Sequence, residues 1–108
     1  MRDEIDEELR QLIIDLNAAG FATCSSCQGK RSQQDFDENK HCNHAFITFD
    51  DLPSRFNRKA KTLGLELYNG GISICPAYED EEPAIFIRHN LLFPAKIREL
   101  FGLTTSTN

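Results

Sequence analysis

Residues 44–64, "HAFITFDDLPSRFNRKAKTLG", indicate how this chain alternates between strand and helix. The stretch opens with "HAFITF", 44–49, which is rich in β-branched and aromatic residues and is typical of a strand. Pro53 suits the first turn of a helix and Gly64 suits its end. The helical spacing predicts an apolar side that faces the core, formed by Phe56, Ala60 and Leu63. It also predicts a basic side that faces solvent, formed by Arg55, Arg58, Lys59 and Lys61.

The N-terminal side of this stretch predicts a helix, a strand and a long loop. Residues 3–19 repeat apolar side chains at helical spacing, and Gly20 is a natural stop. Residues 21–25 follow as a short strand. Residues 28–43 are polar and have no periodicity, so we expect a loop. A loop of this length in a compact domain is usually functional or held in place by something.

The C-terminal side predicts further strands and a last helix. Residues 65–68 suit a short strand, and "NGG" at 69–71 suits a turn. "ISICPAY", 72–78, and "AIFIRH", 84–89, have the composition of two strands that form a hairpin around an acidic connection. We expect Pro94 to open a third helix.

These elements give the order α-β-β-α-(β)-β-β-α. The fold class we expect is α+β, with a single layer of mixed or antiparallel sheet packed by two to three helices. A length of 108 residues favours one domain, which we place at residues 1–103, with a frayed tail at 104–108.

Charge and composition narrow the class of protein. Hydrophobic residues make up 40% of the chain, and no apolar run approaches the roughly 18 residues of a membrane helix. The acidic N-terminus has no signal-peptide core, so we expect a cytoplasmic protein with reduced cysteines. The net charge of −5 argues against a protein that coats nucleic acid, although basic residues gather at 55–61 and 88–98.

Cysteines and histidines at both ends of the 28–43 loop suggest a zinc site. Zinc in structural sites takes four thiolate and imidazole ligands in a tetrahedron. Such an ion would hold the polar loop in place. The ligands that we expect are Cys24, Cys27, Cys42 and His44, with His41 as the substitute for His44.

Two other interpretations of the same residues remain open. The cysteines are either free thiols beside solvent-exposed histidines, or Cys24 and Cys27 form a redox pair. We expect Cys75 to be a small buried core residue and His89 to face solvent at the end of a strand.

Basic residues near the first cysteine pair suggest an anion site. Gly29 permits close approach of the backbone to a ligand, and Lys30 and Arg31 follow it. The alternative is a turn with exposed basic side chains. Arg88 is either an edge-strand residue or the floor of the anion site. On the 53–64 helix, Arg55, Arg58 and Lys59 form either a solvated face or a second surface that contacts phosphate.

Three motifs resemble the wybutosine-synthesis tRNA methyltransferase family of the third-enzyme type. "TCSSCQGK", 23–30, resembles the family's Thr-x-Ser-Ser-Cys-x-Gly-Arg stretch, and it follows a helix that ends in "NAAG". "AKTLGLELYNGGIS", 60–73, and "IFIRHNLLFPAKI", 85–97, resemble later segments. The resemblance implies S-adenosylmethionine as cofactor and a modified guanosine of phenylalanine tRNA as substrate. It also implies site positions at Ser25, Ser26, Cys27, Gly29, Lys30 and Arg88.

The chain also departs from that family. The family's enzymes are longer and carry a Trp-rich strand ending in Ser-His-Asp, whereas this chain has no Trp and places Phe49 where that His would stand. Cys24 and the Cys42/His44 cluster are not part of the family pattern. In size the chain is similar to small virus-encoded and bacterial proteins with a related Ser-Cys-Gln-Gly turn.

Three functional hypotheses follow. The first is a zinc-stapled binding module for a nucleotide or an RNA phosphate, for example a virus-encoded inhibitor that sequesters a nucleotide or blocks a host protein in the host cytoplasm. The second is an S-adenosylmethionine-dependent tRNA or RNA methyltransferase. The third is a redox protein that uses Cys24 and Cys27.

Overall fold

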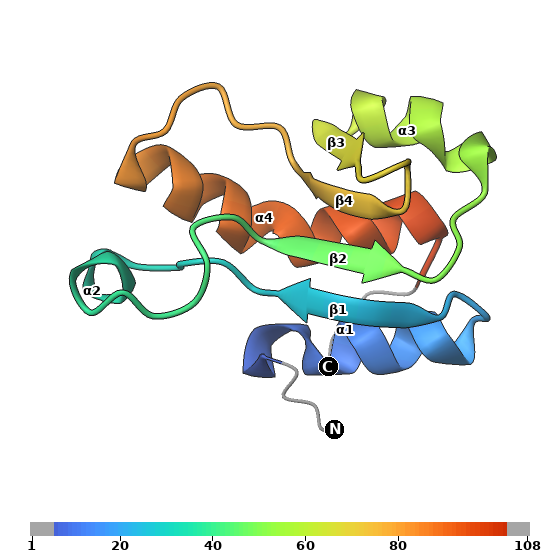
Figure 1. The fold of residues 1–108 in the computed structure, drawn as a ribbon, viewed down its shortest axis with the longest axis horizontal. Helices are drawn as coiled ribbons and strands as arrows, with labels where there is room; N and C mark the ends of the chain where they lie inside the picture. The colour runs from blue at the N-terminus through green and yellow to red at the C-terminus, as the bar shows by residue number, and fades with distance from the viewer. Residues whose placement is uncertain (1–5, 104–108) are drawn as a thin grey trace.

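The computed structural model describes residues 6–103 and shows an α+β fold with one four-stranded antiparallel sheet (Figure 1). The predicted fold class is confirmed. The elements, in chain order, are α1 Glu7–Ala18, β1 Thr23–Cys27, α2 Gln33–Asp37, β2 Phe46–Phe49, the 3-10 turn η1 Ser54–Phe56, α3 Asn57–Thr62, β3 Leu65–Tyr68, β4 Ser73–Pro76 and α4 Pro83–Phe101.

The strands lie in the order β1-β2-β4-β3. β3 and β4 form a hairpin through the predicted "NGG" turn, where Asn69, Gly70 and Gly71 all have positive φ. β2 joins the hairpin to β1, with Ile47 opposite Ile74 on one side and Ser26 on the other. The β1 register shifts between Thr23 and Ser25, which is a bulge.

One face of the sheet is covered by helices. Figure 1 shows α4 passing behind β2 and β4, and α1 running alongside β1. Ile47, Phe49 and Ile74 point to this side and are fully buried with the apolar stripes of both helices. The α1 stripe is Leu9, Leu12, Ile13 and Leu16, as predicted. Residues 3–5 of the predicted first helix and the predicted tail 104–108 lie outside the described residues.

The prediction of a strand at 84–89 is wrong, because these residues lie in the N-terminal part of α4. Six residues are too few to separate an alternating pattern from a helical one. Over the whole element the buried side chains recur every three or four residues, as Phe86, Asn90, Phe93, Ile97 and Leu100. Pro83 starts the helix, and Pro94 lies inside it instead of opening it.

Two residues of this segment therefore differ from the prediction. Arg88 is exposed on a helix and pairs with Glu79, so it is neither an edge-strand residue nor the floor of an anion site. His89 does not face solvent freely, since its side chain is only 14% exposed and its Nε2 lies 2.7 Å from Glu79 Oε1.

The 28–43 segment is not entirely irregular. Residues Gln33–Asp37 form α2, and the Ser32 hydroxyl accepts a hydrogen bond from the Asp35 N–H as its N-cap. The ring of Phe36 stacks on Phe86 of α4 at 6.0 Å between centroids. Local capping and one aromatic contact thus order a segment that lacks apolar periodicity.

The prediction of which side of the 53–64 helix faces the core is confirmed. Ala60 is fully buried, and Phe56 and Leu63 pack against the core. Arg55 and Arg58 are exposed. Over residues 6–103, no helix is long and apolar enough to cross a membrane.

Candidate functional site

The second face of the sheet carries the residues that alternate with the core. In β2, Phe46 and Thr48 point away from the helices, because Ile47 and Phe49 point toward them. The register places Cys75 of β4 opposite Glu66 of β3, and Ser73 opposite Tyr68. We call this surface the open face; its residues are Ser25, Cys27, Phe46, Thr48, Glu66, Tyr68, Ser73 and Cys75.

A hollow of about 460 Å³ lies on the open face. Four of its lining residues carry rings, two carry thiols and one carries a carboxylate. Among the described residues that line it there is no lysine or arginine. The lining residues are Cys42, His44, Phe46, Glu66, Tyr68, Cys75 and Tyr78.

The wall at Tyr78 is fixed by hydrogen bonds and ring contacts. The Tyr78 hydroxyl accepts from the Ala45 N–H at 3.1 Å and donates to Asn90 Oδ1. The His44 ring packs on Tyr78 at 4.9 Å and on Phe86 at 5.0 Å. Burial strongly raises the pKa of Tyr78, so its hydroxyl stays protonated. This side of the hollow is therefore preformed.

The other side of the hollow combines neutral groups with one carboxylate. Burial, followed by the negative charge of Glu66, raises the pKa of Cys75 to about 11. Burial also raises the pKa of Tyr68, whose ring is 45% exposed on the strand at the sheet edge. Cys75 was predicted in the core; instead its strand register turns it to the open face, where it is half-buried. At neutral pH the thiol and the phenol are thus uncharged beside Glu66.

The 25–31 turn, where the sequence suggested a ligand, is occupied by the protein's own side chains. A Cβ added at Gly29 would lie 2.5 Å from Asn90 Nδ2, so the group that approaches this glycine is Asn90. Lys30 is 2% exposed, and its Nζ donates to the His41 carbonyl at 2.6 Å. The Lys30 ammonium also lies 5.5 Å from the Phe36 ring centroid. Lys30 therefore holds the loop and offers no exposed charge.

The neighbouring turn residues are also engaged or separated. Arg31 donates its N–H to Asp35 Oδ2 at 2.8 Å, and its guanidinium lies 3.7 Å from Glu8. Ser25 faces the open side of the sheet, whereas Ser26 faces the helices because it pairs with Ile47. The structure thus does not bring Ser25, Ser26 and Arg31 together on one surface.

The predicted zinc ligands are only partly assembled. The Cys42 N–H donates to Cys27 Sγ at 3.2 Å, so these two cysteines are neighbours. The substitute ligand His41 contacts Gln28 Nε2 at 3.3 Å and Asp6 at 3.5 Å. Within residues 6–103, no three His, Cys, Asp or Glu side chains lie close enough together to hold a metal ion. Zinc binding by Cys24, Cys27, Cys42 and His44 stays a prediction that elemental analysis can test.

The basic residues of η1 and α3 form a solvated surface. Arg55, Arg58 and Lys59 are exposed, and α3 packs along β3, the strand that carries Tyr68. The Arg55 guanidinium lies over the Phe56 ring at 4.7 Å. These residues remain available to contact a phosphate outside the hollow.

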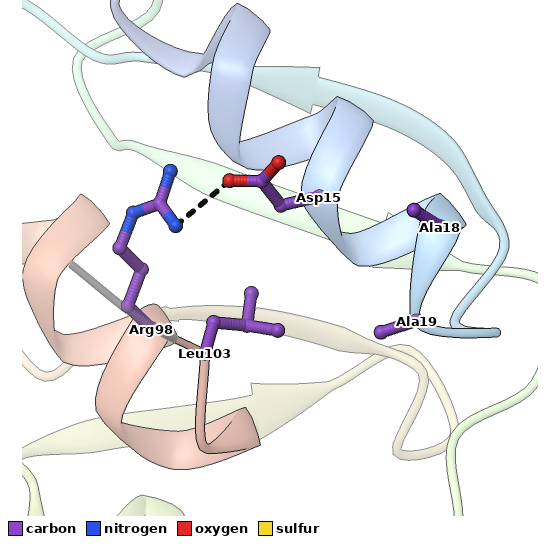
Figure 2. A pocket seen from close by; sticks show the side chains of 5 residues that line it. All are labelled: Asp15, Ala18, Ala19, Arg98 and Leu103. Atoms are coloured by element: carbon purple, nitrogen blue, oxygen red, sulfur yellow. Dashed lines mark ion pairs between the residues drawn. The ribbon is translucent and has the colours of Figure 1, made fainter. Parts of the chain in front are cut away.

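A second concavity, of about 350 Å³, lies between the ends of α1 and α4. Figure 2 shows Asp15 and Arg98 pointing toward each other across it, 2.9 Å apart, with Ala18, Ala19 and Leu103 around them. Hydrogen bonds from Gln11 and then Arg98 lower the pKa of Asp15. The two charges satisfy each other, which makes this concavity a weaker candidate than the open face.

Comparison of the chain with known protein families, curated proteins and solved structures finds no match. The site must therefore be interpreted from its own geometry.

Sequence reasoning missed the residues of the hollow. Glu66, Tyr68 and Tyr78 were placed correctly on or beside strands but were given no role. Part of the signal was present in the strand alternation, which places Glu66 and Tyr68 on one face of residues 65–68 and Ser73 and Cys75 on one face of residues 73–76. Tyr78 follows the second of these strands, so alternation does not place it. What was missing was the knowledge that, within residues 6–103, α1 and α4 pack on the opposite face of the sheet.

Proposed function

We propose that this domain binds a planar nitrogen base, carried on a nucleotide or on single-stranded RNA, in the hollow of the open face. The observation that carries the proposal is the hollow itself, which combines four rings with one carboxylate on the face of the antiparallel sheet opposite α1 and α4. Proteins that read single-stranded RNA often stack bases on aromatic side chains of such a sheet.

The chemistry of the lining favours the base over the phosphate. Base stacking on an aromatic ring contributes about 1–3 kcal/mol per base. Phe46 and Tyr68 come from different strands and supply such rings. The Glu66 carboxylate can accept a hydrogen bond from the exocyclic amino group of a base. A phosphate inside the hollow would meet Glu66 without a lysine or arginine from the lining to offset the repulsion.

The phosphate of a bound nucleotide would then lie outside the hollow. Arg58 and Lys59 are exposed on the helix beside β3 and are candidates for this contact. With one or two such contacts, the affinity should depend only weakly on salt. Each phosphate contact with a single strand changes the slope of log affinity against log salt concentration by only about −0.7. This role suits a module that holds its ligand without transforming it, including a virus-encoded inhibitor that sequesters a nucleotide.

Calorimetry with AMP, GMP, CMP, UMP and a short single-stranded RNA tests the proposal. We expect at least one of them to bind, and Tyr68→Ala to weaken binding about 5- to 150-fold, the equivalent of about 1–3 kcal/mol. Ile14→Ala is the matched control, because Ile14 is similarly exposed, at 52%, on α1. Failure of every ligand to bind, or equal affinity for wild type and Tyr68→Ala, would contradict the proposal.

The same titration separates the binder from the methyltransferase. S-adenosylmethionine carries the adenine of AMP, so a simple base-binding module should bind both with similar affinity. Binding of S-adenosylmethionine at micromolar strength together with weak binding of AMP would favour the enzyme hypothesis.

A further inference from the structure

Two cysteines that are distant in the sequence meet at one end of the open face. Cys27 is the last residue of β1, and Cys42 lies in the segment that leads into β2. The backbone N–H of Cys42 donates to Cys27 Sγ at 3.2 Å. Since the N–Cα bond is about 1.46 Å, the Cα of Cys42 lies within about 4.7 Å of that sulfur. This separation is compatible with a disulfide after rotation of the Cys42 side chain.

The two thiols also differ in exposure. Cys42 is exposed and Cys27 is buried. Cys24, the nearer cysteine in sequence, is exposed on β1 at the bulge, three residues from Cys27 along the strand. An extended strand holds residues three apart at about 10 Å between Cα atoms, which is too far for a disulfide.

We propose that Cys27 and Cys42 form a reversible disulfide that ties the 28–43 loop to the end of β1. The pair is a redox-modification site separate from the base-binding proposal, and it replaces the Cys24/Cys27 pair that the sequence suggested. The closed loop would contain α2 and the buried Lys30, which already contacts the His41 carbonyl next to Cys42.

The oxidant that the reaction needs is a low-molecular-weight disulfide, RSSR, such as glutathione disulfide. The exposed Cys42 loses its proton to solvent and attacks one sulfur of RSSR, which forms a mixed disulfide and releases one RS⁻ that takes up a proton. Cys27 then loses its proton and attacks Cys42 Sγ, which breaks the mixed disulfide and releases the second RSH. Two protein thiols are oxidised by two electrons, and RSSR is reduced to two RSH.

The order of attack follows from the environment of each sulfur. Cys42 is exposed and can meet the oxidant first, whereas Cys27 is buried next to it. Cys27 therefore suits the second, intramolecular step, in which its proximity to Cys42 favours attack on the mixed disulfide. Cys42 also lines the hollow, so oxidation changes one wall of the candidate site.

Oxidation of the full chain with glutathione disulfide, followed by alkylation and peptide mass spectrometry, tests the proposal. We expect a Cys27–Cys42 cross-link, alkylated Cys24 and Cys75, and a thermal midpoint that rises on oxidation and returns when dithiothreitol is added. Cys42→Ser should abolish the cross-link, and Cys24→Ser should leave it intact.

Three results would overturn the proposal: a Cys24–Cys27 cross-link in its place, a mixed disulfide with glutathione on Cys42 that persists without resolving, or zinc that copurifies and protects both thiols from oxidation. None of these readouts depends on a nucleotide, so the disulfide and the base-binding proposal can fail independently.

Discussion

Asn90 joins three separate segments of the chain through a single amide group. Its Oδ1 accepts from the Ala45 N–H at 3.0 Å and from the Tyr78 hydroxyl. Its Nδ2 donates to the carbonyls of Lys30 and Asn43 at 2.8 and 2.9 Å. The side chain is fully buried, and both donors and both acceptor positions are used. Asn90 thus couples α4 to the loop and to the wall of the hollow.

Gly29 is required because Asn90 lies against it. Gly29 has a φ of +76°, and an added Cβ would meet Asn90 Cγ at 2.6 Å and the Ala45 N at 2.7 Å. We predict that Gly29→Ala destabilises the protein by about 2–5 kcal/mol, from left-handed strain together with overpacking. Urea unfolding measures this change.

Gly20→Ala is the matched control for that substitution. Gly20 also has a positive φ, of +96°, but nothing lies within 4 Å of an added Cβ. The Gly20→Ala substitution should therefore lower the free energy of unfolding only by the backbone strain, about 1–2 kcal/mol. Equal losses for the two variants would show that the contact with Asn90 does not contribute.

The raised pKa of Cys75 should make both the stability of the protein and the reactivity of this thiol depend on pH. Its pKa in the folded protein is about 11, above the value of about 8.5 for a free thiol. The stability that this shift contributes is therefore present below about pH 8.5 and is lost as the pH rises toward 11. Alkylation of Cys75 should be slow at pH 7 and should accelerate about tenfold per pH unit.

Glu66→Gln provides the control, because the negative charge of Glu66 is the second cause of the raised pKa. At fixed pH the variant should alkylate faster at Cys75, as followed by mass spectrometry of that peptide. A Cys75 that reacts at the rate of a free thiol at pH 7, or a variant that reacts more slowly, would contradict this account.

At the scale of an element, α4 is the clearest departure from the sequence prediction. "AIFIRH" taken alone satisfies a strand pattern, and Pro94 taken alone suits a helix start. The helix forms because five side chains spaced along 83–101 all reach the core or the Asn90 network. This tertiary gain outweighs the roughly 3 kcal/mol that a proline costs inside a helix.

Two adjacent residues of α4 test this assignment. Phe93 is fully buried, whereas Leu92 is 48% exposed. We predict that Phe93→Ala costs about 3–5 kcal/mol and that Leu92→Ala costs within about 0.5 kcal/mol. Thermal or urea unfolding of the two variants measures the difference, and a larger loss for Leu92→Ala would place the helix in a different register.

At the scale of the molecule, the sequence predicted the layers better than the site. Periodicity identified the α1 stripe, the β2 strand and the buried face of α3, because each depends on local spacing. The burial of Lys30 could not be predicted, since it depends on the His41 carbonyl and the Phe36 ring, which lie farther along the chain.

The hollow could not be predicted for the same reason. Its lining comes from β2, β3, β4 and the segments that flank them, and the strand order β1-β2-β4-β3 brings them together. Alternation in the sequence shows which residues share a face of a strand. It does not show which face the helices leave uncovered.

The central claim is that the open face holds a nucleobase. The most direct test is an amide NMR titration of the ¹⁵N-labelled protein with AMP and with the nucleotide that binds best. The account predicts that the largest shift changes occur at Phe46, Glu66, Tyr68 and Cys75, and that they disappear in Tyr68→Ala while its spectrum stays dispersed. Largest changes at residues 25–31 or on α3, or no changes at millimolar ligand, would contradict it.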